Sequence, residues 1–211
     1  EGTLRNDGDS SWKQFKNFIK SVEIENGITL IQSYVFRDCT RTSAFTIPDS
    51  VTKIGISVFD NTAYYNNAGN WQNGVLYINN HLISAKTTLA GNYIIKDGTK
   101  TVAGNAFLRC SELTSVTMPD SVVSIESYAF AYCTSLTSIE LPDSVTIIGS
   151  WAFRDCTSLI NIKYCFVHNN KNFAYAKCEN TDNLLKKMKK VIDKSDSCVI
   201  INKQLRVWRN W

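Results

Sequence analysis

The residues of this chain that could act as nucleophiles are its seven cysteines, and two histidines could activate them. A reactive thiolate needs a neighbouring histidine or another cationic group that lowers the pKa of the thiol. His81 falls at an expected hairpin turn and His168 where the repeats described below end, whereas Cys110, Cys133 and Cys156 recur every 23 residues. A cysteine that recurs with a repeat should point inward as a small apolar side chain. We therefore expect these three thiols to be reduced and slow to react.

The remaining cysteines are harder to assign from spacing. Because the cysteine count is odd, at least one thiol is free or bonded to another chain. Cys165, Cys178 and Cys198 lie outside the repeated column, and a disulfide among these three is conceivable.

Motifs that would indicate an enzyme or a metal protein are absent from the sequence. It contains no C-x-x-C pair, no glycine-rich phosphate loop and no G-x-S-x-G nucleophile motif. Asp120 and Asp143 recur once per unit beside a proline, so turn formation explains them better than acid–base catalysis. We therefore expect that the protein is not an enzyme and that it has no catalytic, cofactor-binding or metal-binding residues.

An internal repeat positions all of these residues. The segment SVVSIESYAFAYC (121–133) returns as SVTIIGSWAFRDC (144–156), at an offset of 23 residues. The spacing also separates Phe36 from Phe59, whereas Phe59 and Phe107 are 48 residues apart. The array should therefore carry one insertion, at roughly residues 63–92, and a sixth turn should begin near Leu159.

Apolar residues stand in columns at fixed distances from each phenylalanine. Fourteen and twelve positions before Phe130 lie Val116 and Met118, which share one face of a predicted strand. The segment Pro119–Ser121 predicts a turn, and a second short strand follows it. The segment Tyr128–Cys133 is too short for a stable helix and predicts one helical or 3₁₀ turn. A single unit cannot bury enough apolar surface to fold alone, so the units should stack into a solenoid.

The consensus L-T-S-[VI]-x-[ML]-P-D-S-V-x-x-I-x-x-x-A-F-x-x-C resembles the BspA-like leucine-rich repeats of bacterial surface proteins. The resemblance covers roughly residues 19–166. It implies an α/β repeat fold, a right-handed solenoid of about six turns with short parallel strands and short 3₁₀ or helical turns. It also implies an extracellular or cell-surface protein without catalytic activity. Such a module would bind a protein or glycan partner in adhesion or recognition; the alternative is a structural spacer that presents another domain.

The insertion and the tail differ from the repeats. Two apolar runs flank Asn79-Asn80 and predict a β-hairpin. Residues 1–166, the predicted solenoid domain, hold 13 basic and 15 acidic side chains, whereas residues 167–211 hold 10 and 4. This basic tail predicts a helix over about 182–192 and a second hairpin, which together would cap the solenoid. The tail could contact nucleic acid or an acidic surface, but a solvated helix face is the simpler interpretation.

The expected partners follow from the same observations. We expect no nucleic-acid partner, and we expect a monomer. The sequence contains no run of 18 apolar residues, so we expect no insertion into a membrane.

Two surfaces compete as the candidate binding site. One is the hydroxyl-rich face of the first strands, with Thr114, Thr117, Thr137 and Glu140. The other is an aromatic rim two residues before the phenylalanines, together with an aromatic loop in the insertion; these comprise Tyr34, Tyr128 and Trp151, and Tyr64, Tyr65 and Trp71. We favour the rim and loop, because aromatic side chains supply more contact energy per residue. The alternative is that these rings only pack on neighbouring turns.

Overall fold

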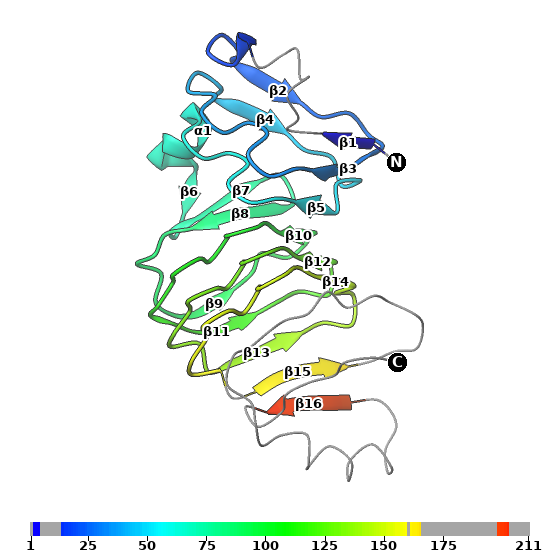
Figure 1. Ribbon diagram of the computed structural model, residues 1–211, viewed down its shortest axis with the longest axis vertical. Helices are drawn as coiled ribbons and strands as arrows, with labels where there is room; N and C mark the ends of the chain where they lie inside the picture. Colours follow the sequence, from blue (N-terminus) through cyan, green and yellow to red (C-terminus); the bar gives the residue numbers. More distant parts are fainter. Residues whose placement is uncertain (1, 5–13, 160, 166–197, 203–211) are drawn as a thin grey trace.

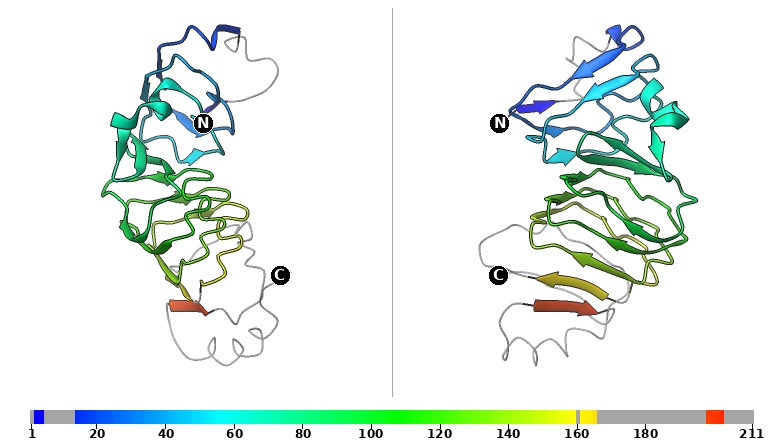
Figure 2. Two further views of the ribbon diagram at one scale, coloured as in Figure 1. Left: turned by 90° about the vertical axis from the view of Figure 1, so that its left-hand side faces the viewer. Right: turned by 180° about the vertical axis from the view of Figure 1, so that it is seen from behind.

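The computed structural model describes residues 2–4, 14–159, 161–165 and 198–202. It shows a stack of short coils of chain that advances from one end of the molecule to the other (Figures 1 and 2). Each coil contains two short strands, and those of successive coils pair in parallel, Ser115 with Ser138 and Thr101 with Ser124. This register confirms the predicted solenoid of 23-residue turns.

The first strands of the coils form two parallel sheets. They are β2 (Ser21–Glu23), β4 (Ala44–Thr46), β9 (Gly91–Ile94), β11 (Leu113–Thr117), β13 (Ser138–Leu141) and β15 (Asn161–Cys165). β2 pairs with β4, and β9, β11, β13 and β15 lie side by side in a second sheet. Alternate side chains point inward as the sequence predicts, since Val116 and Met118 are buried and Thr117 between them is exposed.

The second strands line another side of the stack. They are β3 (Ile28–Ile31), β5 (Lys53–Ile54), β10 (Thr101–Val102), β12 (Ser124–Ile125) and β14 (Ile147–Ile148), and β1 (Gly2–Leu4) pairs with β3. One apolar side chain of each strand is buried in the core, namely Ile31, Ile54, Val102, Ile125 and Ile148. Serine and threonine hydroxyls join successive coils, as when Thr146 Oγ1 donates to the Val123 carbonyl at 3.4 Å.

The recurring phenylalanines lie on the side without strands. Around Phe130, two consecutive turns are closed by Ala131 N–H to Tyr128 O at 3.1 Å and Cys133 N–H to Phe130 O at 3.3 Å. This is the form that the expected helical or 3₁₀ turn takes; among the described residues, helix occurs in the insertion and in a short 3₁₀ segment at 14–15.

Backbone hydrogen bonds also connect the turns around Phe36, Phe107 and Phe130 to the next coil, and we call this set the turn ladder. In each such turn the donors are three peptide N–H groups: that of the phenylalanine itself, that of the residue two positions before it and that of the residue two positions after it. In the coil of Phe130 they are Tyr128 N–H to Ser150 O at 3.1 Å, Phe130 N–H to Ala152 O at 2.7 Å and Tyr132 N–H to Arg154 O at 2.7 Å.

The residues two before and two after each recurring phenylalanine have left-handed backbone. Their φ angles lie between 52° and 66° at Tyr34, Asp38, Ser57, Asn61, Asn105, Arg109, Tyr128, Tyr132, Trp151 and Asp155. Asn and Asp adopt positive φ more readily than bulky residues do. The hydrogen bonds on either side of each turn hold Tyr and Trp in the same conformation.

The insertion forms the predicted hairpin and a short helical segment. Its elements are α1 (Ala63–Asn66), the 3₁₀ helix η2 (Ala68–Asn70), β6 (Trp71–Gln72), β7 (Val75–Ile78) and β8 (His81–Ala85). β7 and β8 pair antiparallel across Asn79, whose φ is 49°. We number the coils by their phenylalanines: Phe36 and Phe59 mark the first and second, or N-terminal, coils, and Phe107, Phe130 and Phe153 mark the third to fifth. β8 pairs in parallel with β10 and thus lies between the N-terminal coils and the third coil (Figure 1).

This hairpin divides the hydrophobic core into two clusters. Val75, Leu82 and Ala85 belong to the C-terminal cluster, whereas Leu76, Ile78 and Ile83 belong to the N-terminal one. Both faces of the hairpin are therefore buried. The hairpin lies between part of the N-terminal coils and the third coil, which also meet directly where Ile56 pairs in parallel with Gly104.

A row of buried polar groups lies where the two parts meet, and we call it the polar seam. It consists of His81, Thr101, Ser124 and Glu126. His81 Nδ1 lies 3.0 Å from Thr101 Oγ1, and its Nε2 lies 3.3 Å from the Pro48 carbonyl. Ser124 Oγ donates to the Thr52 carbonyl at 2.6 Å. The seam thus joins coils that are distant in sequence.

At the C-terminal end, β16 (Cys198–Asn202) pairs antiparallel with β15 and places Cys198 opposite Cys165 in the strand register. The predicted tail helix, the second strand of the predicted tail hairpin and Cys178 lie outside the described residues. The boundary at residue 166 and the capping role therefore remain predictions.

Candidate functional site

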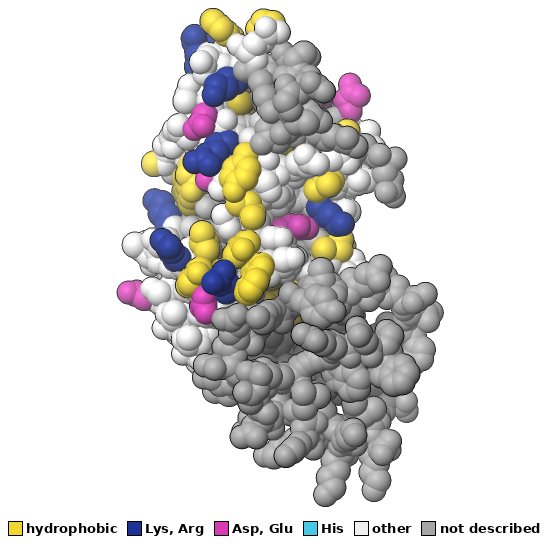
Figure 3. Space-filling model, in the orientation of Figure 1, with side chains coloured by type: hydrophobic (Ala, Val, Ile, Leu, Met, Phe, Trp, Pro, Cys, Tyr) yellow, Lys and Arg dark blue, Asp and Glu magenta, His cyan; other side chains and the backbone are white. Residues whose placement is uncertain are grey.

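The aromatic rim forms a stack of rings and guanidinium groups on the C-terminal coils. The Arg109 and Arg154 guanidinium carbons each lie 5.8 Å from the centre of the Tyr132 ring, and Arg154 also lies 4.8 Å from the centre of the Trp151 ring. Tyr128, four residues before Tyr132, is half-buried. Hydrophobic and basic side chains lie next to one another on the face shown in Figure 3.

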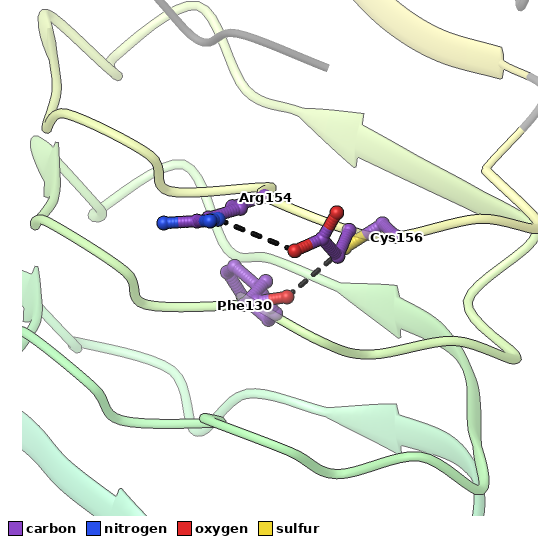
Figure 4. Close-up of polar contacts among 4 residues, drawn as sticks. Phe130, Arg154 and Cys156 are labelled. Atoms are coloured by element: carbon purple, nitrogen blue, oxygen red, sulfur yellow. Dashed lines mark hydrogen bonds and ion pairs between the residues drawn. The ribbon is translucent and has the colours of Figure 1, made fainter. Parts of the chain in front are cut away.

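The turn ladder holds this stack in place. Tyr128 and Tyr132 flank the buried Phe130, so each coil projects side chains outward on both sides of an inward ring. Arg154 is further oriented by its neighbour, since its Nε lies 3.2 Å from Asp155 Oδ2 (Figure 4). The side chains of both residues are about one third exposed, at 36% and 35%. The rim therefore presents a positioned array of aromatic and cationic groups.

Three members of this stack were not among the candidates predicted from the sequence: Arg109, Tyr132 and Arg154. The rim predicted from the sequence consisted of the positions two before each phenylalanine. The positions two residues after each phenylalanine also face outward. The sequence contained a sign of this, because three of these positions hold residue types that favour positive φ, namely Asp38, Asn61 and Asp155.

Tyr34 belongs to the same register but lies on the first coil. Its side chain is 43% exposed, and Arg37 lies over its ring at 5.5 Å. Tyr34 and Arg37 thus form the same kind of arginine–ring contact as the stack, but they lie in the N-terminal part of the molecule, on the other side of the hairpin.

The aromatic loop is packed against the hairpin. Tyr64 Oη donates to the Tyr77 carbonyl at 2.9 Å, and Trp71 Nε1 donates to the Tyr65 carbonyl at 2.8 Å. The rings of Tyr65 and Trp71 meet edge to face at 5.1 Å, and Lys86 lies over Trp71 at 5.6 Å. These contacts agree with the alternative that the rings of the loop pack on neighbouring parts of the protein. A binding role for the loop remains a prediction.

The hydroxyl-rich face is open to solvent. Thr114, Thr117, Thr137 and Glu140 are all exposed. Thr137 Oγ1 donates to the Thr114 carbonyl at 3.1 Å, so this hydroxyl already has a partner within the sheet. Hydroxyls engaged in this way offer a ligand fewer free donors than the rim does.

The cysteine column is buried, as predicted, and includes Cys39 as well. Cys133 Sγ donates to the Phe107 carbonyl at 3.1 Å and Cys156 Sγ to the Phe130 carbonyl at 3.0 Å (Figure 4). Burial raises the pKa of Cys110 to about 12 and also raises the pKa of Cys39. All four thiols of the column are free, which fits a structural role rather than a nucleophilic one.

In the native protein these four cysteines should react with iodoacetamide at least about a hundredfold more slowly than after unfolding, because their thiols are buried in the core and out of reach of the reagent. Peptide mapping by mass spectrometry after brief labelling at pH 8, with and without guanidinium, measures this. A Cys110–Cys133 disulfide in the unreduced protein, or equal labelling in both conditions, would contradict the burial.

The chemistry of an enzyme or metal site was not found in the described part of the chain. His81 is buried and bonded to Thr101 and Pro48, not to a thiol, and His168 lies outside the described residues. No group of three or more potential metal ligands occurs among the residues that the structure places. No helix within those residues is both long and apolar enough to cross a bilayer.

Comparison with known families agrees with the repeat pattern. The profile of the BspA-type leucine-rich repeat region matches residues 8–94 and 86–195, in 6 copies. This chain belongs to the BspA-type leucine-rich repeat family. The match extends over most of the chain and includes both parts of the divided solenoid.

No curated protein matches the chain. A solved leucine-rich cell surface protein from Faecalibacterium prausnitzii is 28% identical, over 70% of this chain and 40% of that one, with a TM-score of 0.32. The chain is also similar to two solved leucine-rich repeat proteins. The one from Bacteroides ovatus is 24% identical over 70% of this chain and 38% of that one, with a TM-score of 0.34. The one from Eubacterium ventriosum is 20% identical over 85% of this chain and 67% of that one, with a TM-score of 0.44. The chain spans 40% and 38% of the length of the first two.

Proposed function

We propose that this BspA-type chain is a non-catalytic recognition module of a cell-surface or secreted protein, and that it binds a protein or glycan partner through its rim. The observation that carries the proposal is the stack of Arg109, Tyr132, Arg154 and Trp151. Tyrosine, tryptophan and arginine are the residues most enriched where binding energy is concentrated. The description of the Faecalibacterium prausnitzii protein as a cell surface protein supports the location.

Preorganisation strengthens the argument for the rim over the sheet face. The N–H groups of Tyr128 and Tyr132 donate ladder bonds, and the carbonyls on either side of Trp151 accept them. The backbone at these three residues is therefore held in place, so their side chains lose little conformational freedom when a partner binds. An arginine stacked on an aromatic ring can still donate hydrogen bonds in the plane of its guanidinium group to sugar hydroxyls, carboxylates or peptide carbonyls.

The partner should be sought on arrays of glycans and host-matrix proteins, and the surface should then be tested by variants. The double variant Tyr128→Asn with Trp151→Asn should lower affinity at least about tenfold, because it removes two anchoring rings. Asparagine is chosen because Asn105 occupies the same register with positive φ, so the fold is retained.

The matched control is Thr117→Lys with Glu140→Lys on the hydroxyl-rich face, which should leave affinity within about twofold. The reverse result, with an unaffected rim variant and a lost interaction in the sheet variant, would place the site on the sheet. If no array component binds the wild-type protein, the spacer role becomes the better explanation.

A further inference from the structure

The turn ladder is broken at one coil, beside the hairpin. In the first, third and fourth coils the central phenylalanine N–H donates to a carbonyl of the next coil: Phe36 to Val58, Phe107 to Ala129 and Phe130 to Ala152, at 3.1, 2.7 and 2.7 Å. The corresponding acceptor for Phe59 would be the Ala106 carbonyl, but this oxygen accepts from Ala85 N–H of the hairpin at 2.6 Å.

The break leaves donors without acceptors. The peptide N–H groups of Phe59 and Asn61 have no hydrogen-bond acceptor among the described residues. Phe59 is only 1% exposed, and a buried N–H group without an acceptor destabilises the folded protein because it has lost its hydrogen bonds to water. Such a group therefore favours any ligand or water that can accept its hydrogen bond.

A cavity of about 200 Å³ lies at this break. Its walls come from three segments: the second coil at 54–60, the hairpin at 83–87 and the third coil at 103–108, with Tyr65 in addition. The polar groups of the wall belong to Ser57, Asp60, Tyr65, Ser84, Thr87 and Asn105. Ile54, Val58, Ile83 and Leu108 supply apolar surface.

We propose that this cavity binds a short, uncharged peptide segment of two or three extended residues, whose carbonyl accepts the hydrogen bond of Phe59 N–H. The equivalent phenylalanine N–H binds a peptide carbonyl in the three coils where the ladder is intact. The hairpin has displaced the coil that would fill this position, so the complementary group is another stretch of backbone.

The cavity wall defines the chemistry further. Asp60 is the only charged residue among those that line it, so an anionic ligand would meet a like charge without a compensating cation. The hydroxyls and the Asn105 amide can accept from the ligand's own peptide N–H groups. The mixed apolar surface suits small side chains such as alanine.

This site uses residues other than those of the rim, and the inference does not depend on the proposed function. The test is a titration of ¹⁵N-labelled protein with acetyl-Ala-Ala-amide, followed by amide chemical shifts. We expect saturable shifts at Phe59 and at residues 103–108, with Phe59 N–H moving downfield as it gains an acceptor.

Adjacent threonines provide a matched pair of variants. Thr87 and Thr88 are both exposed, but only Thr87 lines the cavity. Thr87→Phe should block it and weaken peptide binding at least about tenfold, whereas Thr88→Phe and the rim double variant should stay within about twofold of wild type. Saturable shifts with a methyl hexoside but not with the peptide, no shift at Phe59 with the peptide, or equal binding by both threonine variants would overturn the inference.

Discussion

Replacing Phe130 with alanine should lower the free energy of unfolding by about 3–5 kcal/mol. Phe130 is fully buried, and its ring stacks between those of Phe107 and Phe153 at centroid distances of 4.8 and 5.4 Å. The substitution removes the ring from both neighbours and leaves a cavity in the middle of the C-terminal core cluster, where coils on both sides limit collapse.

Equilibrium denaturation in urea or guanidinium measures this loss. Phe130→Leu should cost less, because it leaves a smaller cavity, and the exposed Thr137→Ala should change the free energy by less than about 0.5 kcal/mol. A loss below about 1 kcal/mol for Phe130→Ala would mean that the inward face has been assigned wrongly.

Replacing Glu126 with glutamine should stabilise the protein at pH 8 by up to about 3 kcal/mol and leave its stability at pH 4 unchanged. Burial in the polar seam raises the pKa of Glu126 to about 7, against the opposing charge of Lys53, and its Oε1 atom has no hydrogen-bond partner among the described residues. The folded protein therefore holds this proton more tightly than the unfolded chain, whose carboxyl titrates near 4.5. Stability is lost as the pH rises from about 4.5 to 7, and glutamine removes that loss.

His81 in the same seam should act in the opposite direction. Burial lowers its pKa to about 4, so the unfolded chain, with a histidine pKa of 6.5, takes up the proton first. Stability is lost as the pH falls from about 6.5 to 4. In wild-type protein the two slopes offset each other between about 4.5 and 6.5, and Glu126→Gln should expose the slope of His81.

The measurement is the free energy of unfolding at several pH values from 4 to 8, for wild type, Glu126→Gln and the exposed control Glu140→Gln. The difference between Glu126→Gln and wild type isolates one carboxyl, because the other groups contribute to both proteins. A difference that does not change with pH would show that Glu126 is not buried in the folded protein.

The repeat itself could be predicted from the sequence because its signals are local. The 23-residue spacing of Phe107, Phe130 and Phe153 fixes the register of one coil on the next. The inward positions follow from alternation along each strand, and the hairpin turn follows from the tolerance of Asn79 for positive φ. Each of these features depends on residues within about one period of each other.

The contents of the junction depend on packing between distant segments, and only the tertiary structure decided them. The hydrogen bond from Ser124 to the Thr52 carbonyl spans 72 residues, and no spacing in the sequence announces it. Alternation places Ser124 and Glu126 on the strand face away from Ile125, and they are buried because the N-terminal coils cover that face. The hairpin buries both of its faces for the same reason, and by taking the Ala106 carbonyl it leaves the Phe59 N–H at a cavity. Periodicity determines which side chains face the core of a coil, whereas the position of an insertion between coils depends on how its two surfaces pack.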